Sequence, residues 1–313
     1  MKKILVTGGT GFIGSAIVKN LLKDHKVTVI DNNTRGSIKR LNFNKKNLKF
    51  INCDIRDKKK VFKSIKNQDI VIHLAYINGT KYFYSKPHEI LDIAIKGLMN
   101  VVDGCIKYKV RELVLASSSE VYQTPGKIPT DENEMIKIPD ILNPRYSYGG
   151  GKILTELVGV NYAKKYFKRL IIFRPHNVYG SDMGKEHVIP ELISKIKKLD
   201  ANKKLVIQGS GNETRSFIHI SDFVKALRIL MKRGKNCNIY NIGTNEEIRI
   251  KTLAKSLLKM MGKKNKIQTS KLKKGSTLRR CPNISKINKI GFTPKISLKN
   301  GLQLVLNKND QIQ

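Results

Sequence analysis

The sequence predicts an α/β protein in which a doubly wound parallel sheet is followed by a smaller α/β domain. Three observations support this prediction. Short apolar strands alternate with helical stretches through the first half of the 313-residue chain. A glycine-rich turn separates the first of these strands from the first helix. Beyond residue 174 glycines become frequent between the apolar stretches, which is typical of a second and less regular unit.

The first βαβ unit sets the pattern that the rest of the sheet repeats. Residues 4–7 form an apolar strand, residues 12–22 have apolar side chains at helical spacing, and residues 26–30 form the second strand. Further strands are expected at 48–52, 70–74, 113–116 and 170–173, with helices at 58–64, 88–107 and 148–165. Because these strands are continuously apolar, we expect a parallel sheet that is covered on both faces.

The second part of the chain predicts a smaller substrate-binding domain. Helices are expected at 188–199, 221–232 and 251–261, and short strands at 205–207 and 238–241. We therefore expect residues 1–174 to form the first domain. Residues 175–306 are expected to form predominantly the second domain, with some segments returning to the first, and residues 307–313 a flexible tail.

The charge of the chain is strongly basic. It has 61 Lys and Arg against 24 Asp and Glu, a formal net charge of +37. Such a charge attracts polyanions and acidic metabolites. The basic residues are nevertheless scattered singly and in short runs, which argues against a specific nucleic-acid surface. Lys, Asn and Ile are all abundant and all use A/T-rich codons, so biased coding is the preferred explanation of the excess.

The cysteines and the apolar runs predict a cytoplasmic protein. The four cysteines lie far apart, without a C-x-x-C pair or a histidine at metal-ligand spacing, so we expect reduced thiols and no metal site. The apolar run at the start of the chain ends at once in Gly8 and Gly9. No stretch approaches the ~18 apolar residues that span a bilayer, so we expect neither secretion nor membrane insertion.

The glycine-rich turn predicts a Rossmann-type dinucleotide site. Gly8 can make the tight turn, Gly11 lets the backbone approach a pyrophosphate, and Gly14 lets helix and strand pack closely. The helix that starts at Phe12 and Ile13 offers N–H groups and a positive dipole to the phosphates. A strand before the turn, a helix after it and an acidic residue at the end of the second strand agree with this interpretation.

The acidic residues after the second and third strands predict the adenosine end of that site. Asp31 is positioned to accept hydrogen bonds from the ribose hydroxyls, and its charge would repel a 2′-phosphate, which favours NAD over NADP. Arg35 lies nearby and is the residue that could reverse this preference. Asp54 either caps the adenine amino group or is an ordinary turn aspartate.

A tyrosine and a lysine four residues apart predict acid–base chemistry. Tyr148 and Lys152 share one face of the predicted helix. A lysine ammonium and the positive nicotinamide ring both stabilise a phenolate, which could then take a proton from a sugar hydroxyl. Ser118 follows the strand at 113–116, and a hydroxyl at the carboxyl end of a parallel strand lies where ligands bind.

Taken together, these motifs resemble the extended short-chain dehydrogenase/reductase family, the sugar-nucleotide epimerases and dehydratases. The resemblance extends nearly from end to end. It is carried by the 8–14 loop, Asp31, His73-Leu74-Ala75, Ser118, Asn143-Pro144, Tyr148 with Lys152, and the segments 174–180 and 215–222.

The resemblance implies a role for each matching residue. Tyr148 would be the base, Lys152 its activator and Ser118 a hydrogen-bond partner of the sugar hydroxyl. Further cofactor contacts are implied for Asn32, Ile55, Leu74, Ala75 and Pro175, and further substrate contacts for Ser119, Asn177, Val188, Arg215 and Arg280. Among the latter, Arg215 and Arg280 resemble phosphate clamps. A homodimer through the helices at 88–107 and 148–165 is also implied.

The implied activity is that of an NAD-dependent nucleotide-sugar epimerase that oxidises the sugar transiently at C4 to a 4-keto intermediate. Glu120 keeps alternatives open, because the dehydratases and some decarboxylases that this segment resembles have Glu there. These alternatives are a nucleotide-sugar 4,6-dehydratase and a uronate decarboxylase; a C4 dehydrogenase that releases the ketone is another. An alternative of another class is a catalytically inactive NAD-sensing or nucleic-acid-binding protein, suggested by the charge.

The expected catalytic helix departs from ordinary helix composition at Gly149, Gly150 and Gly151. Each glycine costs about 1 kcal/mol relative to alanine in a helix interior. We therefore hypothesise that cofactor, substrate or a partner chain packs closely against this backbone. The alternative is that the helix begins late and frays at the glycines.

Overall fold

The computed structural model describes residues 1–42, 46–272 and 275–309. The chain forms two compact units, each built from several segments. The first unit contains Met1–Val121, Ile136–Pro175 and Val224–Tyr240. The second contains Tyr122–Met135, His176–Phe223 and Asn241–Gln313.

A seven-stranded sheet forms the centre of the first unit, with strand order β11-β6-β5-β4-β1-β2-β3. Strands β1 to β6 pair in parallel throughout. The strands are β1 (Lys3–Thr7), β2 (Lys26–Asp31), β3 (Leu48–Asn52), β4 (Ile70–His73), β5 (Glu112–Ala116), β6 (Arg169–Pro175) and β11 (Asn238–Ile242). This arrangement confirms the predicted doubly wound parallel sheet.

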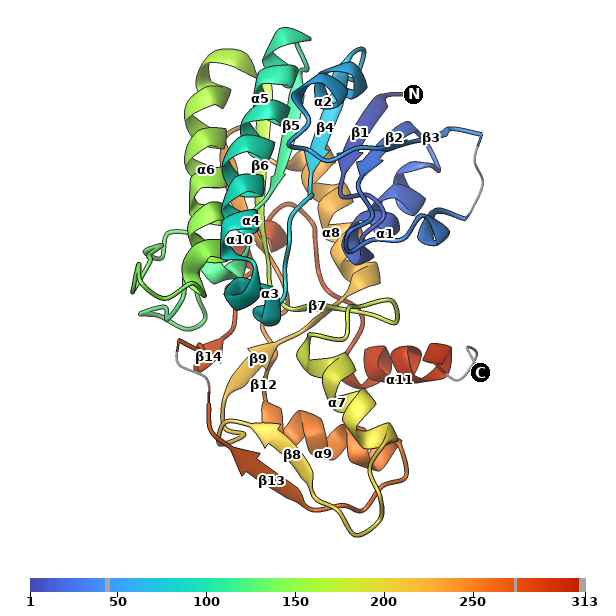
Figure 1. Cartoon of the computed structure of the whole chain (residues 1–313), viewed down its shortest axis with the longest axis vertical. Helices are drawn as coiled ribbons and strands as arrows, with labels where there is room; N and C mark the ends of the chain where they lie inside the picture. Colours follow the sequence, from blue (N-terminus) through green and yellow to red (C-terminus); the bar gives the residue numbers. More distant parts are fainter. Residues whose placement is uncertain (43–45, 273–274, 310–313) are drawn as a thin grey trace. The chain divides into compact units, whose positions relative to one another are not determined.

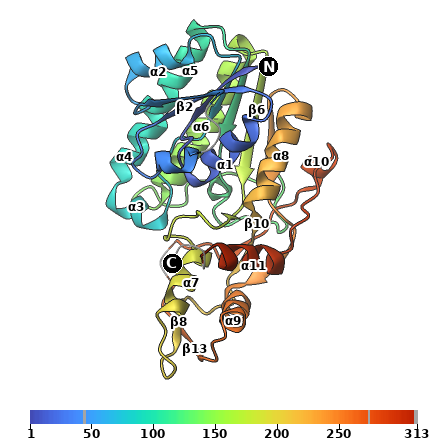
Figure 2. The ribbon, with the colours of Figure 1, turned by 90° about the vertical axis from the view of Figure 1, so that its right-hand side faces the viewer.

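Helices lie on both faces of this sheet. The helices and short helical turns are α1 (Phe12–Leu21), η1 (Ile38–Leu41), α2 (Lys58–Ile65), α3 (Thr80–Ser85), α4 (Pro87–Asp92), η2 (Ile93–Gly97), α5 (Leu98–Lys107), η3 (Ser119–Val121), α6 (Tyr146–Tyr166) and α8 (Ile220–Arg233). Helices α5 and α6 lie on one side of the strands and α1 and α8 on the other (Figure 1). Figure 2 shows α1 and α8 in front of the sheet with α6 behind it. The single helix predicted at 88–107 is three consecutive elements, α4, the π-helical η2 and α5.

The core on the α5 and α6 side is formed by alternate residues of the strands. Leu5, Val71 and Leu113 point to this face and are fully buried in one apolar cluster with residues of α2, α5 and α6. Successive residues of a strand point to opposite faces, so their neighbours Ile4, Ile72 and Val114 face the other side. Those neighbours are buried as well. This explains why the strands are apolar at every position.

The second unit has smaller sheets and its own core. Its elements are β7 (Val178–Tyr179), α7 (Val188–Lys197), β8 (Leu205–Gln208), β9 (Thr214–Ser216), β10 (Ile218–His219), β12 (Glu247–Arg249), α9 (Ile250–Met260), β13 (Ile267–Ser270), β14 (Arg279–Arg280), α10 (Ser285–Asn288) and α11 (Leu298–Asn309). Apolar residues of α7, α9, α11 and β8 form one buried cluster. Strand β8 pairs in parallel with β13, and β9 lies between β12 and β14.

The carboxyl-terminal half contains one segment that returns to the first unit, and it ends in the expected tail. Residues Val224–Tyr240, most of α8 and the start of β11, belong to the first unit. The tail expected at 307–313 begins within α11, which ends at Asn309, and its last four residues, 310–313, lie outside the described residues. Among the described residues, none of the helices has both the length and the hydropathy needed to cross a membrane.

Candidate active site

The glycine turn after β1 has two tightly packed glycines and one open one. An added Cβ at Gly8, whose φ is +72°, would stand 2.8 Å from backbone atoms of Ala75, and one at Gly14 would overlap the carbonyl oxygen of Gly8. An added Cβ at Gly11 would meet only that carbonyl, at 3.3 Å. The space beside Gly11 is therefore where a phosphate can approach the backbone, as the spacing of the glycines predicts.

Helix α1 begins directly at this open position. Gly11 is its N-cap residue, no side chain caps the helix, and its first turn has no acidic residue. The N–H groups at the start of a helix have no partner within the helix, so those at Phe12 and Ile13 are suited to hydrogen-bond an anion. The residues present thus fit the diphosphate of a dinucleotide.

Asp31 lies at the end of β2, beside the glycine turn. Its two carboxylate oxygens accept hydrogen bonds from the backbone N–H groups of Thr10 at 3.0 Å and Asn33 at 2.8 Å. Each oxygen of an ionised carboxylate can accept about two hydrogen bonds, so each still has one acceptor position. These positions fit the two ribose hydroxyls that the sequence assigns to Asp31.

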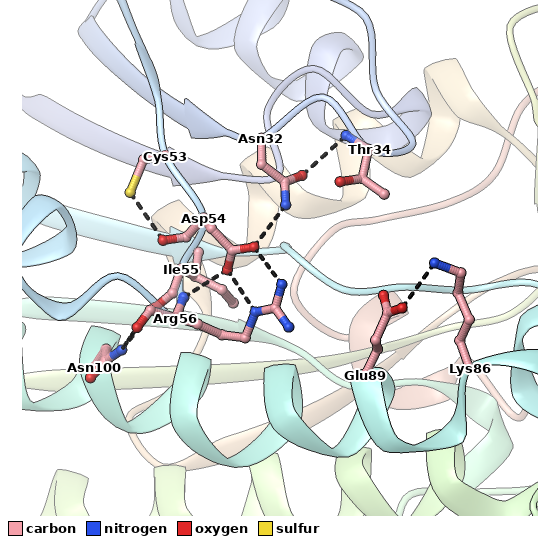
Figure 3. A network of polar contacts seen from close by, with 9 residues as sticks. All are labelled: Asn32, Thr34, Cys53, Asp54, Ile55, Arg56, Lys86, Glu89 and Asn100. Carbon is pink, nitrogen blue, oxygen red and sulfur yellow. Dashed lines mark hydrogen bonds and ion pairs between the residues drawn. The ribbon is translucent and has the colours of Figure 1, made fainter.

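Asp54 lies in a dense polar network (Figure 3). Its Oδ1 accepts from the backbone N–H of Arg56 at 2.9 Å and from Arg56 Nε at 3.0 Å. Its Oδ2 accepts from Arg56 Nη2 at 2.7 Å and from Asn32 Nδ2 at 3.0 Å. The Arg56 side chain contributes most to lowering the pKa of Asp54 to about 2. These four bonds use the acceptor positions of the carboxylate, so an adenine contact by Asp54 would have to replace one of them. That contact stays a prediction.

The segment after β4 is held against the same turn by Thr7. The N–H groups of Leu74 and Ala75 both donate to Thr7 Oγ1, at 3.1 and 3.0 Å. Thr7 Oγ1 also lies 2.8 Å from His73 Nδ1. Burial lowers the pKa of His73 to about 3, so this imidazole is neutral. Leu74 and Ala75, predicted cofactor contacts, thus lie beside Gly8. Pro175, another predicted contact, ends β6.

Tyr148 lies in the first turn of α6 with its ring between two other aromatic rings. It is 5% exposed. The ring of Phe83 stacks on it at a centroid distance of 4.9 Å, and the ring of Tyr76 meets it edge to face at 5.1 Å. Burial against these rings fixes the orientation of the phenol before any ligand binds.

Lys152 lies one turn after Tyr148 and is 3% exposed. Its Nζ donates to the carbonyl oxygen of Ala116 at 2.8 Å and lies 5.9 Å from the centroid of the Tyr148 ring. Burial lowers the pKa of Lys152 to about 7, against an opposing effect of Glu156. A lysine with so low a pKa changes charge near neutral pH, which is a property of groups that act in catalysis.

Three polar residues follow β5, the strand whose last residue, Ala116, binds Lys152. Ser118 and Ser119 are buried, and Ser118 Oγ accepts from the backbone N–H of Glu120 at 3.1 Å. Glu120 Oε2 lies 3.9 Å from Nη2 of Arg145, the residue that precedes α6. The guanidinium of Arg145 is 8% exposed. The structure therefore pairs the predicted catalytic carboxylate with a buried cation.

The second unit contains the other predicted substrate residues, those beyond Ser118 and Ser119. Asn177 has a φ of +40° and donates from Nδ2 to the carbonyl oxygen of Ser216 at 2.8 Å. Val188 is the first residue of α7. Arg215 in β9 and Arg280 in β14 are partners in the register of two parallel strands. The two predicted phosphate clamps are thus neighbours, and an anion between them would relieve the repulsion of their like charges.

Several residues at this site carried no signal in the sequence. Tyr76, Phe83 and Arg145 belong to segments without helical or strand periodicity, and none forms a pattern with Tyr148 on its own. A buried cluster behind α6 was also missed: Arg174 binds Glu156 through Nε at 2.8 Å and Nη2 at 2.6 Å, and Ser117 donates to the same carboxylate. In the sequence, Arg174 contributes only to the segment 174–180 that carries the family resemblance.

The glycine run lies inside α6, so the helix does not begin after it. An added Cβ at Gly151 would overlap Tyr76 Oη and stand 2.7 Å from Ala94 Cβ. One at Gly150 would meet only the flexible side chain of Ile138, at 3.2 Å. At Gly151 the close packing comes from side chains of the chain itself, whereas the hypothesised packing of cofactor, substrate or a partner chain against the glycines stays a prediction.

Comparison with known proteins identifies the family. Residues 4–243 match the model of the NAD dependent epimerase/dehydratase family. A putative UDP-glucose 4-epimerase of Methanocaldococcus jannaschii is 35% identical over 97% of each chain. The human dTDP-D-glucose 4,6-dehydratase is 31% identical over 96% of this chain and 88% of its own. The structure of a UDP-glucose 4-epimerase from Thermotoga maritima superimposes with a TM-score of 0.89 and 27% identity, covering 99% of this chain and 100% of the other.

The match to the family model covers most of the chain, and the relatives align over nearly its full length. The residues that carry the predicted NAD site and the Tyr148–Lys152 pair lie within the matched region. The chain therefore belongs to the NAD-dependent epimerase/dehydratase family and is an NAD-dependent enzyme of the nucleotide-sugar epimerase and dehydratase class.

Proposed function

We propose that the protein is a nucleotide-sugar epimerase that acts through transient oxidation of the sugar at C4 to a 4-keto intermediate. The observation that carries this proposal is the buried pair of Tyr148 and Lys152, one helical turn apart beside the end of β5. The relatives named as 4-epimerases support it. Epimerisation requires one base and a cofactor that stays bound.

The proposed chemistry assigns one task to each side chain. The phenolate of Tyr148 accepts the proton of the C4 hydroxyl, and Ser118 hydrogen-bonds that hydroxyl and orients it. The charged form of Lys152 lowers the pKa of the phenol beside it. When bound at the glycine turn and Asp31, NAD⁺ would supply the hydride acceptor and donor for C4. Tyr148 then gives its proton back to the C4 oxygen.

In the second unit we propose a diphosphate site at Arg215 and Arg280. Guanidinium groups bind phosphate oxygens in a bidentate manner, and the two arginines are register partners in β9 and β14. Asn177 and Val188 would complete the substrate contacts. Arg215→Met should raise KM for the nucleotide sugar at least tenfold with a smaller effect on kcat, and an unchanged KM would contradict the assignment.

Glu120 is the residue that distinguishes epimerisation from dehydration. A 4,6-dehydratase needs a free base for the C5 proton, whereas Glu120 faces the guanidinium of Arg145. A neighbouring cation stabilises a carboxylate and makes it a weaker base. This pairing favours the epimerase proposal. Glu120→Gln should therefore leave interconversion of the C4 epimers within about threefold of the parent rate.

Product mass separates the candidate reactions. The purified protein is incubated with NAD⁺ and a panel of nucleotide sugars, and products are followed by mass spectrometry and NMR. Unchanged mass with inversion at C4 is expected. Loss of water would indicate a dehydratase, loss of carbon dioxide a decarboxylase, and stoichiometric NADH a dehydrogenase. Salt-dependent DNA binding without turnover of any nucleotide sugar would contradict the enzymatic proposal.

A second candidate, conversion of a nucleotide-linked uronic acid, is favoured by Arg145. This buried guanidinium belongs to the N-cap residue of α6, three positions before Tyr148. Its Nε has no hydrogen-bond partner among the described residues. A uronate carboxylate is the substrate group that such a cation would bind. Arg145→Met should then abolish turnover of nucleoside diphosphate glucuronate and spare that of the glucose form. Equal losses on both substrates would contradict this second candidate.

We also propose that the protein is a cytoplasmic homodimer. Exposed apolar side chains lie on the helices at 88–107 and on α6, namely Leu91, Ile95 and Leu157. All four cysteines are free thiols, which agrees with a reducing compartment. Leu157→Glu combined with Ile95→Glu should convert a dimer to a monomer in sedimentation equilibrium. A parent protein that sediments as a monomer would contradict the proposed dimer.

A further inference from the structure

Tyr76 contacts both residues of the predicted acid–base pair, although no pattern in the sequence singled it out. It follows His73-Leu74-Ala75 directly after β4. Its ring meets the Tyr148 ring at an interplanar angle of 88°, and the Lys152 ammonium lies 3.9 Å from its centroid. The two residues of the catalytic pair thus both contact this one ring.

The hydroxyl group of Tyr76 has no visible function of its own. Its oxygen is buried and has no hydrogen-bond partner among the described residues. It points to Gly151, where even a methyl group would overlap it. A buried hydroxyl without a partner is unfavourable, so the hydroxyl does not explain why a tyrosine occupies this position. The aromatic ring is the part of the side chain that makes the useful contacts.

Within the part of the chain that the structure describes, the Lys152 ammonium has no carboxylate partner. Glu156, on α6, is the nearest acidic influence, but its oxygens bind Arg174 from β6 and Ser117 from the end of β5. His73, at the end of β4, is neutral and adds no negative charge. The carbonyl oxygen of Ala116 accepts one hydrogen bond. The face of the Tyr76 ring supplies the nearer aromatic contact, at 3.9 Å against 5.9 Å for the Tyr148 ring, and a cation within about 6 Å of an aromatic centroid is attracted to it.

We propose that Tyr76 is a positioning residue of the active site, whose ring keeps Lys152 charged and fixes the orientation of the Tyr148 ring. The absence of a side chain at Gly151 provides the space that this large residue needs. The inference rests on the assignment of Tyr148 and Lys152 as the acid–base pair. It adds to the pair an aromatic residue that contacts both of its members.

The test compares two substitutions that both fill the space. Tyr76→Phe keeps the ring, whereas Tyr76→Leu keeps an apolar side chain and removes the ring. Without the ring the charged form of Lys152 loses a favourable contact, so its pKa should fall by about one pH unit. The alkaline limb of the pH profile of kcat/KM should move to lower pH by the same amount in Tyr76→Leu and stay in place in Tyr76→Phe. At pH 8 we expect about tenfold lower kcat/KM for Tyr76→Leu and a change below threefold for Tyr76→Phe.

A second measurement does not depend on turnover. In protein labelled with ¹³C at the Cε atoms of lysine, the resonance absent from Lys152→Met is followed across pH in the presence of bound NAD⁺. Its midpoint should be lower in Tyr76→Leu than in the parent and in Tyr76→Phe. An unchanged midpoint in Tyr76→Leu would overturn the proposal, and so would equal losses of activity in both variants.

A third measurement tests the packing of Tyr76 against Gly151. Gly151→Ala should lower the melting temperature of the parent by several degrees, and less so in the Tyr76→Phe background, where the overlapping hydroxyl is gone. Equal effects in the two backgrounds would contradict the size complementarity. If the parent protein turns over no nucleotide sugar while the lysine titration responds as expected, the proposed function fails and the role of Tyr76 stands.

Discussion

Two buried cations lie on or against α6, Lys152 on the helix itself and Arg174 on β6, and their surroundings differ sharply. Arg174 forms two hydrogen bonds with the carboxylate of Glu156, and both side chains are under 5% exposed. Lys152 has a carbonyl oxygen and an aromatic face as its partners, and burial lowers its pKa to about 7. The first cation is fully compensated, and the second is held close to the point of losing its proton.

This difference separates a structural charge from a reactive one. In a buried ion pair with good geometry each charge is compensated by the other, so the pair fixes two elements together. A buried ammonium with weak compensation responds to small changes beside it, such as a phenolate that forms on Tyr148. The same helix therefore anchors the sheet through Glu156 and positions the chemistry through Lys152.

The largest effect is expected from removing the proton acceptor beside Lys152. Tyr148→Phe keeps the stacking on Phe83 but lacks the hydroxyl, so kcat should fall by about 10²–10⁴-fold. NAD⁺ binding, measured by equilibrium dialysis, should be retained. Tyr166→Phe on the exposed part of the same helix is the matched control and should have no effect. A Tyr148→Phe protein with more than a tenth of the parent kcat would contradict the assignment of Tyr148 as the proton acceptor beside Lys152.

The buried Arg174–Glu156 pair should contribute to the stability of the fold and not directly to turnover. Glu156→Gln leaves the Arg174 guanidinium buried without its counter-charge, and such a change costs about 3–5 kcal/mol of unfolding free energy. Chemical unfolding followed by circular dichroism gives this value. Glu191→Gln, which breaks the exposed pair with Lys195, should cost less than about 1 kcal/mol. Similar losses in the two variants would show that burial of the pair is not what matters.

The uncompensated cation should make stability depend on pH in a definite direction. The pKa of Lys152 is about 7 in the folded chain against its ordinary value of 10.5, so between these values the unfolded chain binds one proton more than the folded chain. The contribution of Lys152 to the unfolding free energy therefore rises with pH across this window, and below pH 7 the full penalty for charging the buried group remains.

Lys152→Met tests this dependence because it removes the charge and keeps an apolar chain. The variant should be more stable than the parent at pH 6, and its advantage should shrink as the pH approaches 10. Urea unfolding at pH 6, 7.5 and 9 measures the trend, with Lys164→Met on the exposed face of α6 as control. A constant difference between Lys152→Met and the parent over this range would mean that Lys152 titrates normally.

The sequence predicted the parts of the molecule that depend on local pattern. The first βαβ unit follows from apolar periodicity, and its bounds agree with the structure to within one residue. The glycine turn follows from three glycines, of which Gly8 and Gly14 leave no room for a side chain and Gly11 leaves the backbone open. Tyr148 and Lys152 could be placed on one helix face because four residues make about one turn.

The contacts that tune the site could not be predicted in this way. Tyr76 and Lys152 are far apart in sequence, and so are Glu120 and Arg145; only the packed sheet brings the members of each pair together. Residues 76–85 include just one short helix, α3, so periodicity says nothing about where the ring of Phe83 points. Strands β10 and β14 are two residues long, too short to show alternation.

The smallest effect concerns the glycines that separate Tyr148 from Lys152, where the structure distinguishes two neighbours. Gly150→Ala should raise the unfolding free energy by up to about 1 kcal/mol, because alanine is favoured within a helix and Ile138 can move to admit the methyl group. Turnover of Gly150→Ala should be unchanged. Gly151→Ala, in contrast, should lower the unfolding free energy, because its methyl group would overlap Tyr76. Paired melting curves and rate measurements decide the matter. A loss of turnover in Gly150→Ala with intact stability would instead indicate that a ligand or partner chain lies against this turn of α6, as the glycine run by itself suggests.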